Sequence, residues 1–422
     1  MKLAVYGDTV AALTTAAVLA DTGNQVALVC PGDTQDILNH RLAVEPGLEP
    51  LFEAARQAGR LKLTTLEQVV DRPVHFFVMR PEQQAWAEQL AGRLAQGVGP
   101  CTLINRATFP IGTSEALQAR IQTDRSCVLV VEPDFVPEGR AVHAFTRPDR
   151  ILIGTDSAAA EALIRELYRP FNRNRDVIQV LSPRAAEMTK FATNAMLATR
   201  ISFINEMAQL AEALDVDIEQ VRQGLGSDHR IGFDFLYPGL GFGGPNFARD
   251  VARLADTLRE RGVDGTMLEA VLAVNEAQKE VLFRKAWQHF GYELQGRVFA
   301  LWGLSYKPLS ASVENAPSVP LAQTLIAQGA RVRVHDPAAT AAFVAALPKR
   351  LRHQVVVCDT PEAAVEEADG VMLLTEWKCY WHPDWEALKG GMRTPVVFDG
   401  RNIYPPERVR QVGFEYYGVG RR

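Results

Sequence analysis

The sequence predicts an α/β protein in which two parallel-sheet domains are joined by a central helical domain with one long helix. Three observations lead to this prediction. The first residues run strand, tight turn, helix, strand; a long segment from Ser182 keeps helical periodicity; and a second strand, helix and strand series begins at Gly296. A chain of 422 residues is also too long for a single hydrophobic core.

The N-terminal segment forms one predicted βαβ unit. Residues 2–6 are a short β-rich run, Gly7 opens a turn, residues 10–19 carry apolar side chains at helical spacing, and Gly23 ends that helix. Residues 25–30 are a second apolar run of strand length, and this order is typical of a doubly wound sheet. Further buried strands are predicted at residues 74–79, 101–106, 127–133 and 150–156.

The middle of the chain has a different pattern. The segment PRAAEMTKFATNAMLATRISFINEMAQLAEAL contains no glycine and no proline after Pro183. A helix of this length connects domains or forms a subunit interface, because one small domain cannot cover it. A second helical region is predicted at residues 249–289, after a glycine-rich loop.

The last part of the chain repeats the architecture of the first without repeating its sequence. RVFALWGL is a predicted strand, SVPLAQTLIAQGA a helix that ends before Gly329, and RVRVHDP the next strand. DGVMLLTEW and PVVFDGRN continue the parallel-strand pattern. The predicted domains are therefore residues 1–180, 181–294 and 295–422.

Charge and cysteine content narrow the function classes. The net charge of −5 argues against nucleic-acid binding, because phosphate contacts need concentrated Lys and Arg. Asp8, Thr9 and Asp21 interrupt the N-terminal apolar runs, so neither a signal peptide nor membrane insertion is expected. The five cysteines form no C-x-x-C pair, which favours buried free thiols in the cytoplasm over disulfides or metal ligands. No metal site is predicted.

The turn after the first strand matches the dinucleotide-binding pattern G-x-G-x-x-G/A only in part. Gly7 and Ala12 fit, but Thr9 places a Cβ where a pyrophosphate approaches the backbone. Asp8 places a carboxylate at the helix N-terminus, where phosphate binds; the favoured alternative is that Asp8 simply caps the helix. The second strand ends in Cys30 instead of the acid that holds the ribose hydroxyls.

The loop GFGGPNFARD, residues 241–250, predicts a backbone held close to a ligand, because it contains three glycines and two phenylalanines. Asn246 at its centre is neither a nucleophile nor a group that titrates near neutral pH. Lys190 and Asn194 lie one turn apart on the long helix, and facing this loop they would polarise a hydroxyl or stabilise an oxyanion. The alternative is a solvated lysine and a surface asparagine.

Several long segments together resemble the UDP-glucose dehydrogenase family of nucleotide-sugar 6-dehydrogenases. They are AEMTKFATNAMLATRISFINEMA, DHRIGFDFLYPGLGFGGPNFARD, LWGLSYKP, TPVVFDGRNIY, FVPEGRAVHAFTRPDRILIG and the C-terminal GFEYYGVGR. The resemblance spans essentially the whole chain, in order. It implies an N-terminal Rossmann domain that binds NAD, a long central helix that builds a dimer, and a C-terminal Rossmann-like domain that binds UDP.

The resemblance also implies which residues form the site. The family oxidises C6 of the sugar twice, and the second oxidation uses a cysteine in a GFGGSCFPKD loop. That cysteine falls on Asn246, and the aspartate that activates water is kept as Asp250. Lys190 and Asn194 match the catalytic lysine and asparagine, and Thr108 keeps a family hydroxyl. The residues implied to line the UDP-sugar pocket are Asp134 (shortened from Glu), Phe135, Val136, Glu138, Arg230 (across the dimer), Phe235, Leu236, Tyr237, Phe242, Gly243, Phe247, Lys307 and Arg401.

The departures from the family pattern concentrate on the cofactor and the thiol. The cofactor positions are Gly7, Thr9, Val10, Cys30 and Arg80. Met79 and Arg80 replace a glycine and a threonine of a VGTP loop, and Glu314 replaces an arginine near the start of the C-terminal domain. NAD is the cofactor that the family implies, and these changes predict that the chain binds it weakly or not at all.

Three functions follow as alternatives. The first is a catalytically silent protein that binds a UDP-sugar, with UDP-glucose favoured, as a homodimer or as a heterodimer with an active paralogue in polysaccharide precursor metabolism. The second is an active NAD-dependent UDP-sugar 6-dehydrogenase with altered cofactor use, or one that stops at the aldehyde. The third is a structural scaffold with a vestigial pocket. An amide does not add to an aldehyde as a thiolate does, which places the first alternative ahead.

Overall fold

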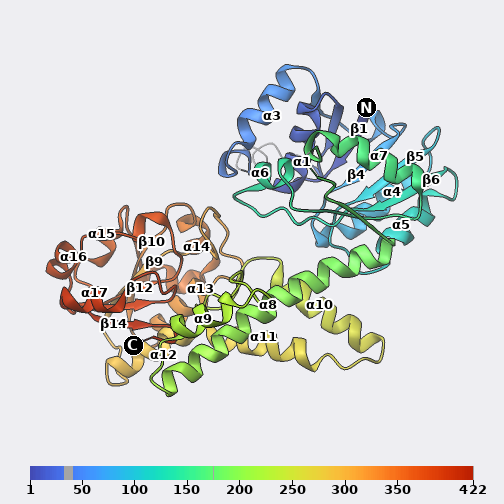
Figure 1. The fold of residues 1–422 in the computed structure, drawn as a ribbon. Coiled ribbons are helices and arrows are strands. Elements are labelled where there is room, and N and C mark those ends of the chain that lie inside the picture. The colour runs from blue at the N-terminus through green and yellow to red at the C-terminus, as the bar shows by residue number, and fades with distance from the viewer. Residues whose placement is uncertain (33–40, 174, 422) are drawn as a thin grey trace. The chain divides into compact units, whose positions relative to one another are not determined.

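The structure, a computed structural model, describes residues 1–32, 41–173 and 175–421. Within these residues the chain divides into two compact units, Met1–Ala192 and Thr193–Arg422. Each unit contains one β-sheet, with helices on both faces (Figure 1). The first unit ends inside a helix, and the predicted domain borders at residues 180 and 294 stay a prediction.

The first unit is built on an eight-stranded sheet in the order β3-β2-β1-β4-β5-β6-β7-β8. Its strands are β1 (Lys2–Tyr6), β2 (Gln25–Val29), β3 (Leu61–Leu63), β4 (Val74–Phe77), β5 (Cys101–Asn105), β6 (Cys127–Val131), β7 (Ile151–Gly154) and β8 (Ile178–Leu181). Its helices are α1 (Val10–Asp21), α3 (Leu48–Gln57), α4 (Gln84–Leu94), α5 (Thr113–Ile121), α6 (Ala141–Thr146) and α7 (Ala158–Tyr168), with 3-10 helices η1 (Leu66–Gln68), η2 (Pro81–Gln83) and η3 (Arg169–Phe171).

Both faces of the first sheet are buried, which explains why its strands are apolar without alternation. Leu3 and Val5 of β1 pack into a core with α1, α3, α6 and α7, while Ala4 and Tyr6 pack into a second core with α4 and α5. The neighbouring strands are parallel except β6 and β7, which pair antiparallel through Val131 and Gly154. The strands predicted in this part are present, β1 with the predicted bounds and the others slightly shorter, and β3 and β8 were not predicted.

The second unit is built on a six-stranded, all-parallel sheet in the order β11-β10-β9-β12-β13-β14. Its strands are β9 (Val298–Trp302), β10 (Arg331–His335), β11 (Val355–Val357), β12 (Gly370–Leu373), β13 (Val396–Asp399) and β14 (Glu415–Gly418). The helices after β9 are α13 (Ser318–Ala327), α14 (Thr340–Ala346), α15 (Pro361–Val365), α16 (Trp385–Gly391) and α17 (Pro406–Gln411), with η4 (Lys349–Gln354) and η5 (Lys378–Tyr380).

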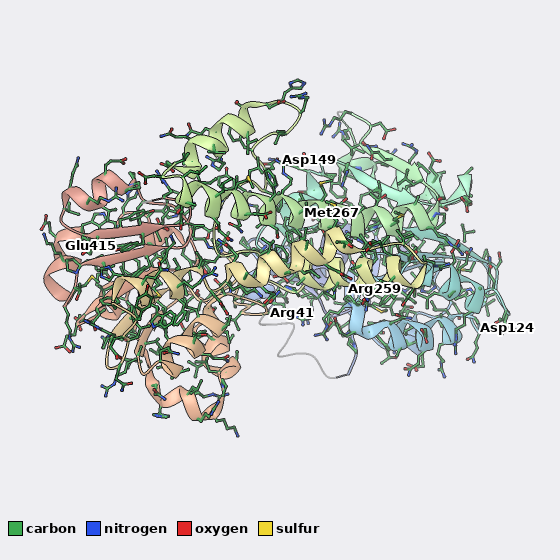
Figure 2. All side chains as sticks on the ribbon, turned by 90° about the horizontal axis from the view of Figure 1, so that it is seen from below. Arg41, Asp124, Asp149, Arg259, Met267 and Glu415 are labelled. Carbon is green, nitrogen blue, oxygen red and sulfur yellow. The ribbon has the colours of Figure 1, made fainter. Side chains whose placement is uncertain are left out.

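A helical region precedes this sheet, as predicted. It consists of α8 (Pro183–Ala213), α9 (Ile218–Ser227), α10 (Phe247–Glu260), α11 (Thr266–Gln278) and α12 (Val281–His289). The long predicted helix is α8, with 31 residues. Helices α10 and α11 pack against each other, and Arg259 pairs with Glu269 at 3.0 Å beside the turn that joins them, where Figure 2 labels Arg259 and Met267. The fold class predicted from the sequence is confirmed.

No helix among the described residues has both the length and the apolar character needed to cross a membrane. The cysteines carry free thiols, as predicted. Cys101, Cys127 and Cys358 are buried and Cys30 is half-buried. Cys379, in η5, is exposed, so the prediction of buried thiols is wrong at that position.

Candidate functional site

The first turn of the chain is held tightly by its own neighbours. Gly7 has φ of 146°, and a Cβ at this position would lie 2.1 Å from the carbonyl oxygen of Val78, so only glycine fits. The Cys30 thiol donates to the Gly7 carbonyl oxygen at 3.3 Å, so the position expected to hold a ribose acid is used to fasten the turn. Val10 is the first residue of α1.

Thr9, and not Asp8, caps α1, which corrects the favoured role of Asp8. Thr9 has extended backbone angles, and its hydroxyl accepts the N–H of Ala12 at 3.1 Å. The same hydroxyl lies 3.4 Å from the Val78 carbonyl oxygen, to which it donates. One of the N–H groups at this helix N-terminus is therefore already bonded within the chain.

Asp8 is buried and is held by arginines. Its side chain is 2% exposed and lies 3.2 Å from Arg41 Nη1 and 3.4 Å from Arg80 Nη2. Gln83 Nε2 also donates to Asp8 Oδ1, at 3.5 Å. Figure 2 labels Arg41, where the described chain resumes after the segment 33–40. The sequence-based picture of a bare repelling carboxylate is wrong, because the three charged side chains together carry one net positive charge.

The residues of this turn do not fit a dinucleotide pyrophosphate as they stand. The carboxylate of Asp8 takes the arginines that would otherwise be free for phosphate, and the hydroxyl of Thr9 takes an N–H at the helix start. Directly after β2, the position where an acidic residue would bind the ribose is Cys30, which carries no carboxylate. Pyrophosphate binding is opposed because the donors of this turn already have acceptors within the chain, and not because the turn has a negative net charge.

The glycines of the loop 241–250 are required by packing within the chain. A Cβ on Gly241 would lie 2.5 Å from Asn275 Oδ1, one on Gly243 would lie 2.8 Å from the Asn315 carbonyl oxygen, and one on Gly244 would lie 2.6 Å from the Tyr306 ring. The close neighbours of these three glycines are side chains and backbone of the second unit, and the approach of the loop backbone to a ligand stays a prediction.

Four side chains at the end of this loop form a closed polar cluster. Asn194 Nδ2 donates to Asp250 Oδ2 at 2.6 Å, and Arg249 Nε donates to Asp250 Oδ1 at 2.9 Å. Arg249 Nη2 lies 2.8 Å from the same Oδ1 and donates to Asn246 Oδ1 at 3.0 Å. Asp250 is fully buried, whereas Asn246 is exposed. The structure thus brings together three of the predicted catalytic residues and adds Arg249.

The orientation of the Asn246 amide follows from this cluster. The guanidinium of Arg249 has only donors, so Asn246 must present its oxygen to it. The NH₂ end of Asn246 therefore points away from Arg249, at an exposed position. The loop offers a hydrogen-bond donor where the resemblance implies a thiol.

The remaining predicted catalytic residues lie in the first unit. The ammonium group of Lys190 donates to the Asp134 carbonyl oxygen at 2.5 Å and lies 4.8 Å from the Phe135 ring centre. Arg150 lies over the same ring at 4.9 Å, so Phe135 is held by two cations. Thr108 is half-buried in the segment after β5.

The segment 134–138 after β6 carries three more predicted residues. Asp134 Oδ1 accepts the N–H of Val136 at 3.0 Å and a guanidinium N–H of Arg106 at 3.3 Å, so its carboxylate fastens the segment. Glu138 is exposed.

The predicted pocket residues of the second unit fall into a buried and an exposed set. Leu236 and Phe242 are buried, and Phe242 contacts Phe247 edge-on, with ring centres 5.8 Å apart. Phe235 has φ of 60°, and its ring centre lies 6.1 Å from that of Phe247. Tyr237 is exposed and lies under the Arg222 guanidinium at 4.6 Å.

The charged pocket residues already have contacts within the chain. Arg401 Nε donates to the Leu374 carbonyl oxygen at 2.6 Å and lies 3.2 Å from Glu376 Oε2. Lys307 Nζ lies 5.6 Å from the Tyr306 ring centre. Arg230 is exposed and forms a salt bridge with Asp228 at 2.6 Å.

Sequence reasoning missed two residues that hold predicted ones in place. Arg41 binds Asp8 but lies outside every motif, so no local signal marks it. Arg106 binds Asp134 and follows β5 directly, and the carboxyl end of a parallel strand is a signal that could have identified it. Among the described residues no group of three or more His, Cys, Asp or Glu side chains is placed to hold a metal ion.

Models of three domains of one family match the chain. The matched descriptions are UDP-glucose/GDP-mannose dehydrogenase family NAD binding domain over residues 1–172, central domain over residues 184–277, and UDP binding domain over residues 300–406.

Individual relatives agree with these models. A UDP-glucose 6-dehydrogenase of Pseudomonas aeruginosa is 40% identical and covers 100% of this chain and 98% of its own length. A Bacillus subtilis UDP-glucose 6-dehydrogenase is 34% identical, with 100% and 98% covered. The structure of a UDP-glucose dehydrogenase from Pyrobaculum islandicum superimposes with a TM-score of 0.89 at 29% identity and covers 100% of this chain and 98% of that chain. The chain therefore belongs to the UDP-glucose/GDP-mannose dehydrogenase family.

Proposed function

We propose that this protein binds a UDP-sugar, with UDP-glucose favoured, and does not oxidise it. The observation that carries the proposal is the closed cluster of Asn194, Asn246, Arg249 and Asp250 in the loop where the resemblance implies the catalytic thiol. This loop contains no cysteine. An amide at its centre holds an oxygen atom by hydrogen bonding but does not add to a carbonyl carbon.

The state of Asp250 supports the same proposal. A carboxylate that activates water needs an oxygen open to that water. Asp250 is fully buried, one oxygen accepts from Asn194 and the other from Arg249.

The first turn supports the absence of oxidation independently. NAD supplies hydride acceptance in this family, and this chain's part would be to bind and orient it. Asp8 and Thr9 already occupy groups that would bind the pyrophosphate, and Cys30 offers no carboxylate for the ribose. We propose that NAD binding is weak for this reason.

Binding of the sugar nucleotide rests on the C-terminal part of the second unit. We propose that Lys307 and Arg401 bind the diphosphate, because a guanidinium and an ammonium suit phosphate oxygens. Phe242, Phe247 and the backbone at Gly243 would pack against the sugar. Arg401 is 17% exposed and is held in place by the chain itself. Its guanidinium would have to contact the diphosphate while keeping its contact with Glu376.

The oligomer is part of the proposal. Helix α8 exposes Met196, Phe203 and Leu210, which are 60%, 45% and 51% exposed and are seven residues apart. An apolar stripe of this kind is typical of a subunit interface. We propose a homodimer, or a heterodimer with an active paralogue in polysaccharide precursor metabolism, in the cytoplasm.

One observation favours the alternative of an active dehydrogenase. Asn194 and Asp250 remain in hydrogen-bond contact at 2.6 Å, and Lys190 lies one turn before Asn194 on α8. Alcohol-to-aldehyde oxidation needs no thiol. Incubation with a panel of UDP-sugars and NAD or NADP, followed by NADH or NADPH absorbance, decides this point, and turnover with any of them contradicts a silent function.

The central experiment is calorimetric titration with UDP-glucose and with NAD. We expect saturable binding of UDP-glucose and little heat from NAD. Arg401→Ala should weaken UDP-glucose binding about tenfold or more, since it removes a charge-assisted contact. Arg410→Ala, which removes an arginine that lies over the Tyr416 ring, is the matched control. Absence of UDP-glucose binding would leave the scaffold as the function, and tight NAD binding would contradict silence.

A further inference from the structure

The first unit contains a pocket whose lining does not include Gly7, Asp8 or Thr9 of the first turn. It is bounded by the segment after β6, by α6, by residues 147–150 and by β7, and its volume is about 470 Å³. That size falls within the range of small-molecule sites in proteins. Phe135 and Val136, which the resemblance implies to contact the UDP-sugar, line part of the pocket, whereas its floor and its outer wall are formed by other residues.

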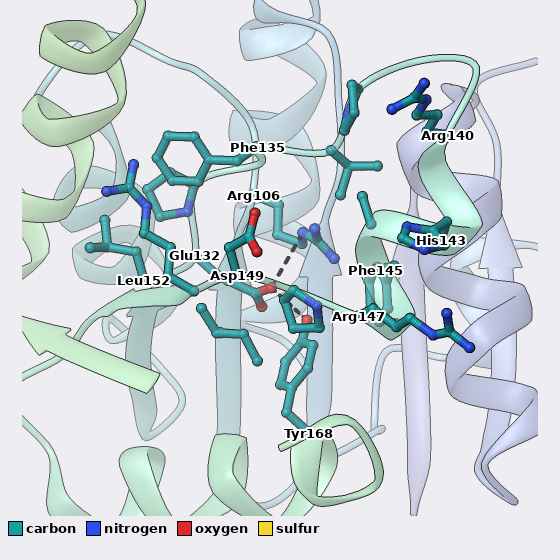
Figure 3. A pocket seen from close by; sticks show the side chains of 17 residues that line it. Arg106, Glu132, Phe135, Arg140, His143, Phe145, Arg147, Asp149, Leu152 and Tyr168 are labelled. Carbon is teal, nitrogen blue, oxygen red and sulfur yellow. Dashed lines mark hydrogen bonds and ion pairs between the residues drawn. The ribbon is translucent and has the colours of Figure 1, made fainter. Parts of the chain in front are cut away.

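The floor of the pocket is a buried ionic cluster. Arg106 and Glu132 are 4% and 5% exposed, and Arg106 Nε lies 3.6 Å from Glu132 Oε1. Tyr168 donates its hydroxyl proton to the same oxygen at 2.5 Å, and Figure 3 shows the carboxylate of Glu132 between Arg106 and Tyr168. Burial raises the pKa of Glu132 above its usual range, and Arg106 opposes that shift.

Two polar atoms of this floor are unsatisfied. Among the described residues, Glu132 Oε2 and Arg106 Nε have no hydrogen-bond partner, although both atoms are buried. Buried polar atoms without partners are costly, and a ligand group that satisfies them is bound in return. One atom is an acceptor and the other a donor, and a hydroxyl group both donates and accepts.

The outer wall of the pocket is basic. Arg140, Arg147 and Arg150 line it together with His143, and Asp149 is the acidic side chain among these wall residues. All five are exposed, and Figure 3 shows Arg140, His143 and Arg147 on one side of the pocket. Within the described residues, the Arg140 and Arg147 side chains form no salt bridge. Arginines in this arrangement suit the oxygens of a phosphate group.

Apolar surface joins the floor to the wall. The Phe145 ring lies against Arg106, with its centre 5.0 Å from the guanidinium carbon, and Phe135 and Pro148 also line the pocket. A ligand that fits these three zones has hydroxyl groups at one end, a C–H surface in the middle and an anion at the other. We propose that this pocket binds a small sugar phosphate, with a hydroxyl against Glu132 and Arg106 and the phosphate among Arg140 and Arg147.

The floor also connects this pocket to the segment proposed to contact the sugar nucleotide. Arg106 donates to Asp134 at 3.3 Å, and the Asp134 carbonyl oxygen accepts from Lys190. A ligand hydroxyl that accepts a hydrogen bond from Arg106 would contact the same guanidinium that holds the Asp134 carboxylate. The pocket is thus a second site whose occupancy bears on the position of residues 134–138.

The test is calorimetric titration of the full chain with α-D-glucose 1-phosphate. We expect one saturable site, with glucose and inorganic phosphate each binding at least about tenfold more weakly, because each meets only one end of the pocket. A second titration in saturating UDP-glucose should leave this binding in place. Displacement by UDP-glucose would overturn the proposal, because glucose 1-phosphate would then occupy the nucleotide-sugar site.

The double variant Arg140→Ala/Arg147→Ala should weaken glucose 1-phosphate binding about tenfold or more, and both side chains are exposed, so folding is retained. Arg93→Ala/Arg169→Ala removes two exposed arginines of the same unit and should bind as the wild type does. No binding of glucose 1-phosphate, or equal binding by the two double variants, contradicts the proposal. If UDP-glucose fails to bind, the comparison of the two double variants still tests whether glucose 1-phosphate binds in this pocket.

Discussion

The first turns of the two sheets are both closed by a carboxylate of the chain itself, but in different ways. After β1, the carboxylate belongs to Asp8 in the turn, and the side chains of Arg41 and Arg80 hold it. Arg80 is 50% exposed, so solvent reaches it, whereas Arg41 is 21% exposed and its Nη1, which faces Asp8, is buried. The turn after β1 is therefore closed by ionic contacts between three side chains.

After β9, the carboxylate comes from the neighbouring strand. Asp336 directly follows β10, and its oxygens accept the backbone N–H groups of Leu304 at 2.6 Å and Ser305 at 3.0 Å. It also accepts from the backbone of Ala338 and Ala339 and from the Trp377 indole. This closure is part of the fold, because backbone donors have no alternative partner once buried.

The two turns show that a carboxylate of the chain can occupy a turn in two ways, with different consequences for stability and for ligand binding. A carboxylate bonded to buried backbone groups contributes to stability and offers no room to a ligand. A carboxylate bonded to arginine side chains, of which Arg80 is half exposed, is separable from the fold, and removing it leaves cations at the site.

The largest expected effect is on Asp336. Asp336→Ala leaves several buried N–H groups without an acceptor, so the free energy of unfolding should fall by about 4 kcal/mol. Asp8→Ala should cost less, about 2 kcal/mol, because Arg80 is half exposed and water can replace the carboxylate at its guanidinium. Urea unfolding of both variants measures this contrast. Equal losses would show that the two closures do not differ in kind.

Acid should destabilise the first unit before the second. His75 on β4 is fully buried beside Tyr6, with 2.9 Å from its Nδ1 to the Tyr6 hydroxyl, and burial lowers its pKa to about 3. The unfolded chain takes up this proton near pH 6.5 and the folded chain does not, so stability is lost as pH falls from 6.5 towards 3. At pH 4 the loss is about 3 kcal/mol.

The second unit has a matched pair for comparison. His335 Nδ1 lies 2.8 Å from the Tyr380 hydroxyl, and burial lowers the His335 pKa while Asp336 and Glu362 oppose the shift. Hydrogen exchange at pH 4 should therefore show faster exchange in β1 and β4 than in β9 and β10. The double variant Tyr6→Phe/His75→Phe removes the titrating group and should abolish that difference. Persistence of the difference would assign it to another group.

Sequence patterns predicted the two sheets well because both are buried on two faces. Apolar runs such as residues 74–79 and 127–133 are visible without knowing any contact, and these strands differ from the prediction only at their ends and in the antiparallel step between β6 and β7. The short strands β3, β8, β11 and β14 were not predicted. The cap of α1 was assigned to Asp8, although Thr9 holds it, because a carboxylate and a hydroxyl at adjacent positions are equally good caps in the sequence.

Long-range charge pairs were beyond the sequence. Arg41 lies 33 residues from Asp8 and Arg106 lies 28 residues from Asp134, and no periodicity joins such positions. The glycines of the loop 241–250 were correctly seen as close-packed, but the neighbours at Asn275 and Tyr306 come from elements much later in the chain. The site residues named from the family resemblance stay predictions until ligands are tested.

A smaller effect is expected when the first turn is opened. Asp8→Gly/Thr9→Gly removes the carboxylate and the Cβ, so Arg41 and Arg80 become free for a pyrophosphate. We expect about tenfold tighter NAD binding by calorimetry, which corresponds to one or two recovered charge-assisted contacts. Asp336→Gly, the equivalent change after β10, should give no gain. NAD binding equal to that of the wild type would show that the lost ribose acid dominates.

The smallest expected effect is that of Asn246→Cys alone, for which we predict no NADH formation from UDP-glucose. The new thiol would stand beside Arg249, which favours a thiolate, but Asp250 would keep both oxygens bonded to Asn194 and Arg249. The first turn, in the other unit, would still be closed by Asp8. Activity should need Asn246→Cys and Arg249→Lys together with Asp8→Gly/Thr9→Gly, because the two regions limit different steps. NADH production by the single variant would contradict this prediction. It would mean that NAD displaces Asp8 from Arg41 and Arg80, and that the closure after β1 is weaker than the backbone hydrogen bonds of Asp336.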